Sequence, residues 1–85
     1  MSKLEFLILS IFLSNAAVSK FSGMTVIDIL TAEDLNYHIT TIHNHLKTFC
    51  KKGFVCEGAK DGKALTFYIT SAGIQKLKEE KENEK

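Results

Sequence analysis

The first third of the chain joins one strongly apolar segment to a short amphipathic one through a polar break. From Lys3 to Asn15 most residues are apolar and neither glycine nor proline interrupts, which predicts a helix. Thr25 and Asp28 have the spacing of a capping box, so a second, short helix is expected to begin there and to end by Leu35.

A third helix is expected over residues 37–52. Its apolar residues recur at helical spacing, and Gly53 stands where a helix commonly ends in the left-handed conformation. The inward positions of this helix are Ile39, Ile42, Leu46 and Phe49. The opposite face then carries Thr40, Asn44, Lys47 and Lys51, with Thr41 and Thr48 on one flank.

The outward face of this third helix has the chemistry of a DNA-binding surface. It contains hydroxyl groups, an amide and lysines but no carboxylate, and such groups suit base edges and phosphates in a major groove. Asn44, at its centre, is the candidate for adenine, because a carboxamide pairs bidentately with that base. The alternative is an ordinary solvated face, although such faces usually mix glutamate with lysine.

A hairpin follows the third helix. Residues 54–57 and 64–70 have strand-like composition, and the Asp61-Gly62 pair between them is typical of a hairpin turn. Lys60 and Lys63 straddle this turn, where they are expected to lie along a DNA backbone or minor groove. The alternative for both lysines is simple solubility of the turn.

The end of the chain is expected to be a short helix and a tail. Thr70 or Ser71 can cap a helix that runs from Ala72 through Lys78. Residues 79–85 hold four glutamates and two lysines, so they are expected to form a charged, disordered tail outside a domain of residues 1–78.

This order of elements predicts an α+β fold of the winged helix-turn-helix type. The segments Thr40-Thr41-Ile42-His43-Asn44-His45-Leu46 and Lys51-Lys52-Gly53-Phe54-Val55 resemble the recognition helix and its exit in MarR-type and PadR-type regulators. Tyr68-Ile69-Thr70-Ser71-Ala72-Gly73-Ile74 resembles the strand-to-helix junction of the same families. The resemblance covers residues 24–77 and implies DNA binding and transcriptional repression. The chain departs from it at Asn44, where such regulators often carry arginine.

The small size of the chain favours a homodimer. A chain of 85 residues has a small core, and the apolar residues of the first helix cover nearly its whole circumference. The apolar side chains of this helix that do not face its own core need a second burial surface, so Phe6, Leu9 and Leu13 are expected to form a dimer seam. The alternative is a central helix buried on all sides within one chain.

Enzyme, metal and membrane functions are not indicated. The sequence has no glycine-rich phosphate loop and no nucleophile in a recognisable context, and no cofactor is expected. His43 and His45 diverge by about 200° on a helix, which argues against a metal site, and Cys50 and Cys56 are expected to be buried free thiols. The first 17 residues resemble a signal peptide, but Glu5 offsets the charge of Lys3, and a cytoplasmic location is expected.

The sequence therefore predicts a small homodimeric transcriptional repressor that binds double-stranded DNA. Residues 37–52 would enter the major groove, and residues 58–63 would contact the backbone or minor groove. Two alternatives stay open. A protein-protein interaction module is favoured by the net charge of only +1 and the absence of arginine. A plasmid or phage segregation or replication adaptor would use the same fold to coat repeated sites.

Overall fold

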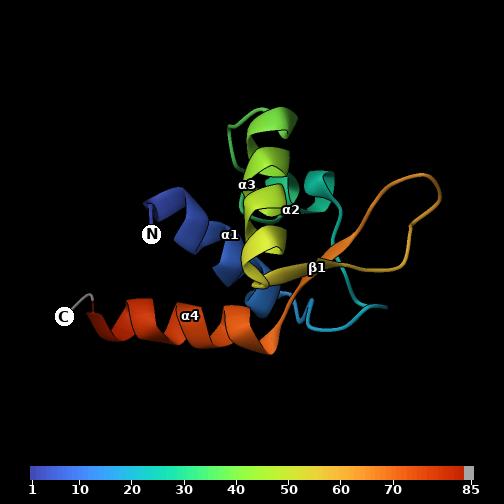
Figure 1. The fold of residues 1–85 in the computed structure, drawn as a ribbon. Coiled ribbons are helices and arrows are strands. Elements are labelled where there is room, and N and C mark those ends of the chain that lie inside the picture. The colour runs from blue at the N-terminus through green and yellow to red at the C-terminus, as the bar shows by residue number, and fades with distance from the viewer. Residues whose placement is uncertain (84–85) are drawn as a thin grey trace.

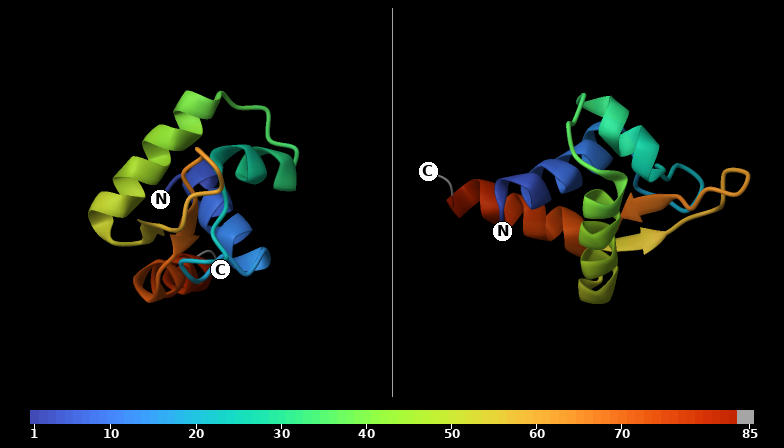
Figure 2. Two further views of the ribbon diagram at one scale, coloured as in Figure 1. Left: turned by 90° about the vertical axis from the view of Figure 1, so that its right-hand side faces the viewer. Right: turned by 90° about the horizontal axis from the view of Figure 1, so that it is seen from above.

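The computed structural model describes residues 1–83 and contains four helices and a two-stranded antiparallel hairpin (Figure 1). The elements are α1 (Lys3–Ser14), α2 (Val26–Ala32), α3 (Ile39–Lys52), β1 (Val55–Glu57), β2 (Phe67–Ile69) and α4 (Ser71–Asn83). Their order confirms the predicted α+β winged helix-turn-helix fold. The wing and the far end of α4 project in opposite directions from the body (Figures 1 and 2).

Side-chain caps fix the start of the first two helices. Thr25 and Asp28 form the predicted capping box: the Asp28 N–H donates to Thr25 Oγ1 at 3.1 Å and the Thr25 N–H donates to Asp28 Oδ2 at 3.0 Å. Ser2 and Glu5 form an equivalent box at α1, which the sequence analysis did not identify. Each box satisfies backbone donors that a helix leaves free at its start.

The core is built around α1, which contacts α2, β2 and α4. Leu9 is fully buried inside this core, so its assignment to a dimer seam is wrong. Ile39, which was expected to face inward, is 52% exposed, because α3 begins at this residue and first reaches the core at Ile42. The buried apolar side chains around α1 are those of Ile29, Ile42, Leu46, Phe49, Val55, Phe67, Ile69 and Leu77.

The α1–α2 linker holds the root of the wing. In the hairpin Val55 pairs with Ile69 and Glu57 pairs with Phe67. Met24 exchanges two backbone hydrogen bonds of 2.8 Å with Phe67 on the other edge of β2. The carbonyl oxygen of Lys20 also accepts from the Ala59 N–H at 2.9 Å. The linker thus acts as a short third strand, and it fixes the wing relative to the helices.

The last helix is longer than predicted. The hydroxyl of Thr70 accepts from the Gly73 N–H at 3.1 Å, which confirms Thr70 as one of the two expected caps. From there α4 continues to Asn83, so residues 79–83 are helical where a disordered tail was expected. Glu80 pairs with Lys76 at 3.2 Å and lies 4.0 Å from the N-terminal ammonium group, and these contacts support the extra turn. The rest of the expected tail lies outside the described residues.

Candidate nucleic-acid interface

The outer face of α3 is open to solvent, as its helical period predicts. Ile42, Leu46 and Phe49 are at most 1% exposed and hold the helix against the core. The predicted DNA-binding side chains on the other side are Thr40, Asn44, Lys47 and Lys51, which are exposed, and Thr41, which is half-buried. The helix thus separates a packing face from a polar face that is free to meet a partner.

Positive charge is concentrated on this part of the molecule. Between Leu35 and Cys56 the chain has no aspartate or glutamate and three lysines, Lys47, Lys51 and Lys52. Lys51 and Lys52 occupy the last turn of α3, where the helix dipole favours cations. Many of the carboxylates lie elsewhere, at the end of α2 and in the distal half of α4. A near-neutral chain therefore carries a local basic surface.

The start of α3 differs from the starts of α1 and α2. Its N-cap residue, His38, makes no side-chain capping hydrogen bond within the described part of the chain. The first N–H groups of a helix have no partner inside the helix, and together with the helix dipole they favour a phosphate. The exposed Thr40 side chain lies in this first turn. The amino-terminal end of α3 therefore has both backbone and hydroxyl donors to offer.

The wing is hydrogen-bonded up to its tip. Asp61 and Ala64 exchange two backbone hydrogen bonds of 3.0 Å, and Gly62 between them has a φ of 64°, as the first central residue of a type II′ turn requires. Nearer the strands, the Thr66 hydroxyl donates to the Ala59 carbonyl oxygen. Lys60 and Lys63 are exposed on this ordered hairpin, which projects beside α3 (Figure 2).

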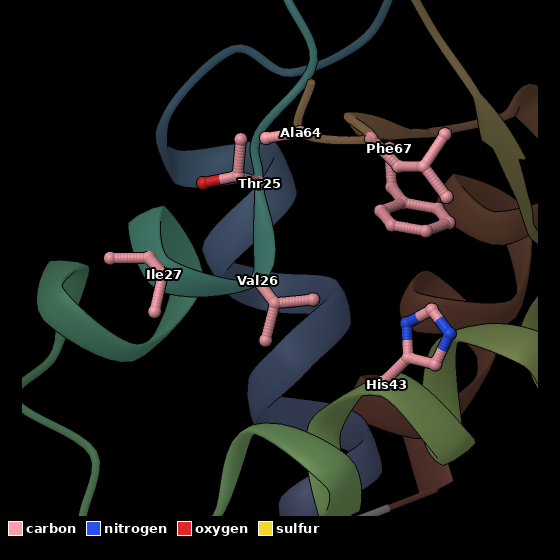
Figure 3. A pocket seen from close by; sticks show the side chains of 7 residues that line it. Thr25, Val26, Ile27, His43, Ala64 and Phe67 are labelled. Carbon is pink, nitrogen blue, oxygen red and sulfur yellow. The ribbon is translucent and has the colours of Figure 1, made fainter. Parts of the chain in front are cut away.

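A cleft with a volume of about 250 Å³ separates α3 from the wing (Figure 3). His43 forms one wall, and its ring meets the ring of Phe67 edge-on with 6.2 Å between centroids. From the sequence, His43 was considered only as a candidate metal ligand, a role that its spacing from His45 argues against. Its position one residue before Asn44 was visible in the sequence, but its neighbours across the cleft were not. The remaining lining residues are Thr25, Val26, Ile27, Ala64 and Leu65.

The other candidate residues form no second site. Within the described residues no group of three or more histidine, cysteine or acidic side chains is placed to hold a metal ion. Cys50 and Cys56 are free and half-buried rather than fully buried. Burial raises the pKa of the Cys50 thiol, with smaller contributions from Cys56 and Glu57. None of the described helices has the length and hydrophobicity needed to cross a membrane.

The expected dimer seam is only partly available on the surface. Leu13 is 39% exposed at the end of α1, whereas Phe6 is half-buried against the core. Leu9 is not accessible. The apolar circumference of α1 is thus covered largely by the protein's own α2, β2 and α4.

Comparison with known proteins identifies relatives over nearly the whole chain. No family model matches the sequence. The DNA-binding protein TubR of Clostridium botulinum C phage is 32% identical over 77 residues, which span 91% of this chain and 93% of the relative. The solution structure of the DNA-binding TubR fragment from Clostridium botulinum matches with a TM-score of 0.72 and 32% identity, covering 93% of this chain and 95% of that one. The similarity is thus to TubR, and not specifically to the MarR-type and PadR-type regulators that the motifs resemble.

Proposed function

We propose that this chain, which belongs to the TubR family, binds double-stranded DNA as a homodimer with α3 in the major groove. The observation that carries the proposal is the exposed, carboxylate-free face of α3, held outward by Ile42, Leu46 and Phe49. The relative is itself named as a DNA-binding protein. An exposed basic helix beside an ordered wing is the arrangement that winged-helix proteins use on DNA.

Each side chain of this interface has a distinct role in the proposal. Asn44 pairs with an adenine, because its amide lies at the centre of the exposed face. Thr40 and Thr41 contact bases or a phosphate at the start of the helix, and Lys47 and Lys51 contact phosphates. Lys60 and Lys63 extend the contact from the wing to the backbone or the minor groove.

The homodimer rests on the small size of the chain and on the open part of α1. In the proposal Leu13 and the accessible part of Phe6 form the seam, and Ile74 of α4, which is half-buried, adds to it. Two subunits related by a twofold axis would present two α3 helices to one pseudo-palindromic site. Leu9 has no part in this seam, since it is fully buried within one chain.

The biological role that we favour is a segregation or replication adaptor that coats repeated DNA sites. Repression was implied by the resemblance to MarR-type and PadR-type regulators, whereas the family membership is TubR, and the matching relative comes from a phage. A net charge of +1 also suits coating, because neighbouring copies on one duplex repel each other little. A transcriptional repressor that binds one operator is the second candidate.

The test of DNA binding uses the purified protein with fluorescent duplexes from its own upstream region and with random duplex, across a salt series. Asn44→Ala should remove the preference for the specific duplex, a loss of about 1–3 kcal/mol. Lys47→Ala should weaken binding to both duplexes and lower the salt slope by about 0.9. Lys78→Ala, an exposed lysine on α4, is the matched control and should change neither.

The size of the footprint separates the two biological roles. A segregation adaptor should protect several adjacent repeats as one continuous footprint, whereas a repressor should protect a single short operator. Absence of binding to every duplex at low salt would refute the proposal and favour the protein-protein interaction module.

A further inference from the structure

The cleft between α3 and the wing contains none of the residues to which a DNA contact has been assigned. Yet it opens between the two elements that bind DNA in the proposed function, because residues of α3 and of the wing both line it (Figure 3). In a winged-helix complex the recognition helix lies in the major groove and the wing reaches the adjoining backbone or minor groove. The strand that separates the two grooves must pass between these elements. The cleft lies on that path.

The size and lining of the cleft suit one unit of a DNA strand better than a separate ligand. Pockets for small molecules usually measure roughly 300–1,000 Å³, and this cleft measures about 250 Å³. Val26, Ile27, Leu65 and other apolar side chains supply most of its surface, which suits the carbon atoms of a deoxyribose. His43 is the lining residue whose ring nitrogens can donate to a phosphate, and its ring lies at the cleft wall facing Phe67 (Figure 3).

The charged groups around the cleft favour an anion. Lys47 follows His43 by four residues on α3 and therefore lies on the same side of the helix, and Lys63 precedes Ala64 in the wing. No carboxylate lines the cleft among the described residues. The nearest acidic side chain on α2 is Asp28, whose Oδ2 accepts the Thr25 N–H and which lines a different pocket.

We propose that this cleft seats one sugar-phosphate unit of the bound DNA strand, with a protonated His43 donating a hydrogen bond to the phosphate. The proposal rests on the proposed function and adds to it a contact that senses pH. An adjacent anion favours the charged form of a histidine side chain, so DNA binding takes up a proton. If the phosphate strengthens proton binding about ten-fold, DNA affinity rises about six-fold from pH 8 to pH 6.

The experiment compares the whole protein with His43→Gln and with His45→Gln in fluorescence-anisotropy titrations of one duplex at pH 6, 7 and 8. His45→Gln is the matched control, because His45 lies two residues away on the same helix, near Glu5 of α1. His38 is present in all three proteins, so their differences isolate His43. We expect the six-fold rise in the wild type and in His45→Gln, and a nearly flat profile in His43→Gln. At pH 6 the salt slope of His43→Gln should also be about 0.9 smaller.

A second variant keeps the test decisive if His43→Gln does not fold. Ala64 is exposed on the wing side of the cleft, so Ala64→Glu should fold and place a carboxylate at its mouth. Repulsion between this carboxylate and the phosphate should weaken binding about ten-fold at pH 6. Full pH dependence in His43→Gln, or unchanged affinity in Ala64→Glu, would overturn the proposal while leaving DNA binding intact. No DNA binding by the wild type at any of the three pH values would instead refute the proposed function.

Discussion

The hydroxyl group of Thr70 ties the end of α3 to the start of α4, immediately after the second strand of the wing. Its Oγ1 donates to the Gly53 carbonyl oxygen at 2.6 Å and accepts from the Gly73 N–H at 3.1 Å. Thr70→Val keeps the shape of the side chain and removes both hydrogen bonds. The variant therefore measures what this connection contributes to stability.

The expected loss follows from the surroundings of the two partners. Gly73 is buried, so its N–H is left without a partner, and loss of such a helix cap typically costs about 1 kcal/mol. Gly53 is exposed, so water can replace the hydroxyl, and that bond contributes roughly 0.5–1 kcal/mol. We expect a total near 2 kcal/mol, which corresponds to a fall in Tm on the order of 10 °C for a domain of this size.

Urea unfolding followed by circular dichroism measures the effect. All variants are compared at one protein concentration, because dimerisation would couple stability to concentration. Thr70→Ser keeps the hydroxyl and should retain most of the stability. Ser71→Ala changes the exposed neighbour and serves as the control. A Thr70→Val protein within about 0.5 kcal/mol of the wild type would refute this account of the connection.

Three further variants test α1. If the proposed homodimer forms through Leu13, Leu13→Lys should give a folded monomer in size-exclusion chromatography with light scattering, because Leu13 is 39% exposed and its replacement leaves the core intact. Leu9→Ala should instead lower the free energy of unfolding by about 2–5 kcal/mol without changing the assembly. A Leu13→Lys protein that stays dimeric would contradict the seam. At the other end of the helix, the hydrogen bond from the Ser2 backbone N–H lowers the pKa of the Glu5 carboxyl group below its usual 4.5. The ionised carboxylate therefore stabilises the folded protein above pH 4.5, and this contribution to the free energy of unfolding is lost as the pH falls through the folded pKa. Glu5→Gln should therefore be less stable than the wild type at pH 6, and this difference should shrink as the pH falls toward 3 in urea unfolding; a difference that does not change with pH would exclude this coupling.

The period of the hydrophobic positions was sufficient to predict the order of the elements and the outward face of α3. It could not decide which side of an almost wholly apolar helix meets the core, and for this reason Leu9 was assigned to the wrong surface. The capping box at Thr25 was identified because a polar break precedes it. The one at Ser2 was missed because Glu5 was considered only as a charge.

Features that depend on contacts between distant segments were outside the reach of the sequence. The composition of residues 79–83 is that of a solvated tail, but Glu80 also lies 4.0 Å from the N-terminal ammonium group, at the other end of the chain, and this contact supports a helix there. The cleft beside His43 brings together the start of α2, the middle of α3 and the wing. Local patterns contain no information on such a junction.

The hydrogen bonds that run to the tip of the wing affect the thermodynamics of DNA binding. Ordering a flexible loop costs roughly 1–2 kcal/mol per residue in backbone conformational entropy. In this hairpin the bonds of Gly58 with Thr66 and of Asp61 with Ala64 impose that order when the chain folds. In the proposed complex Lys60 and Lys63, which are exposed, would therefore approach DNA from a backbone that is already fixed, and their contacts would add to affinity with little entropic loss.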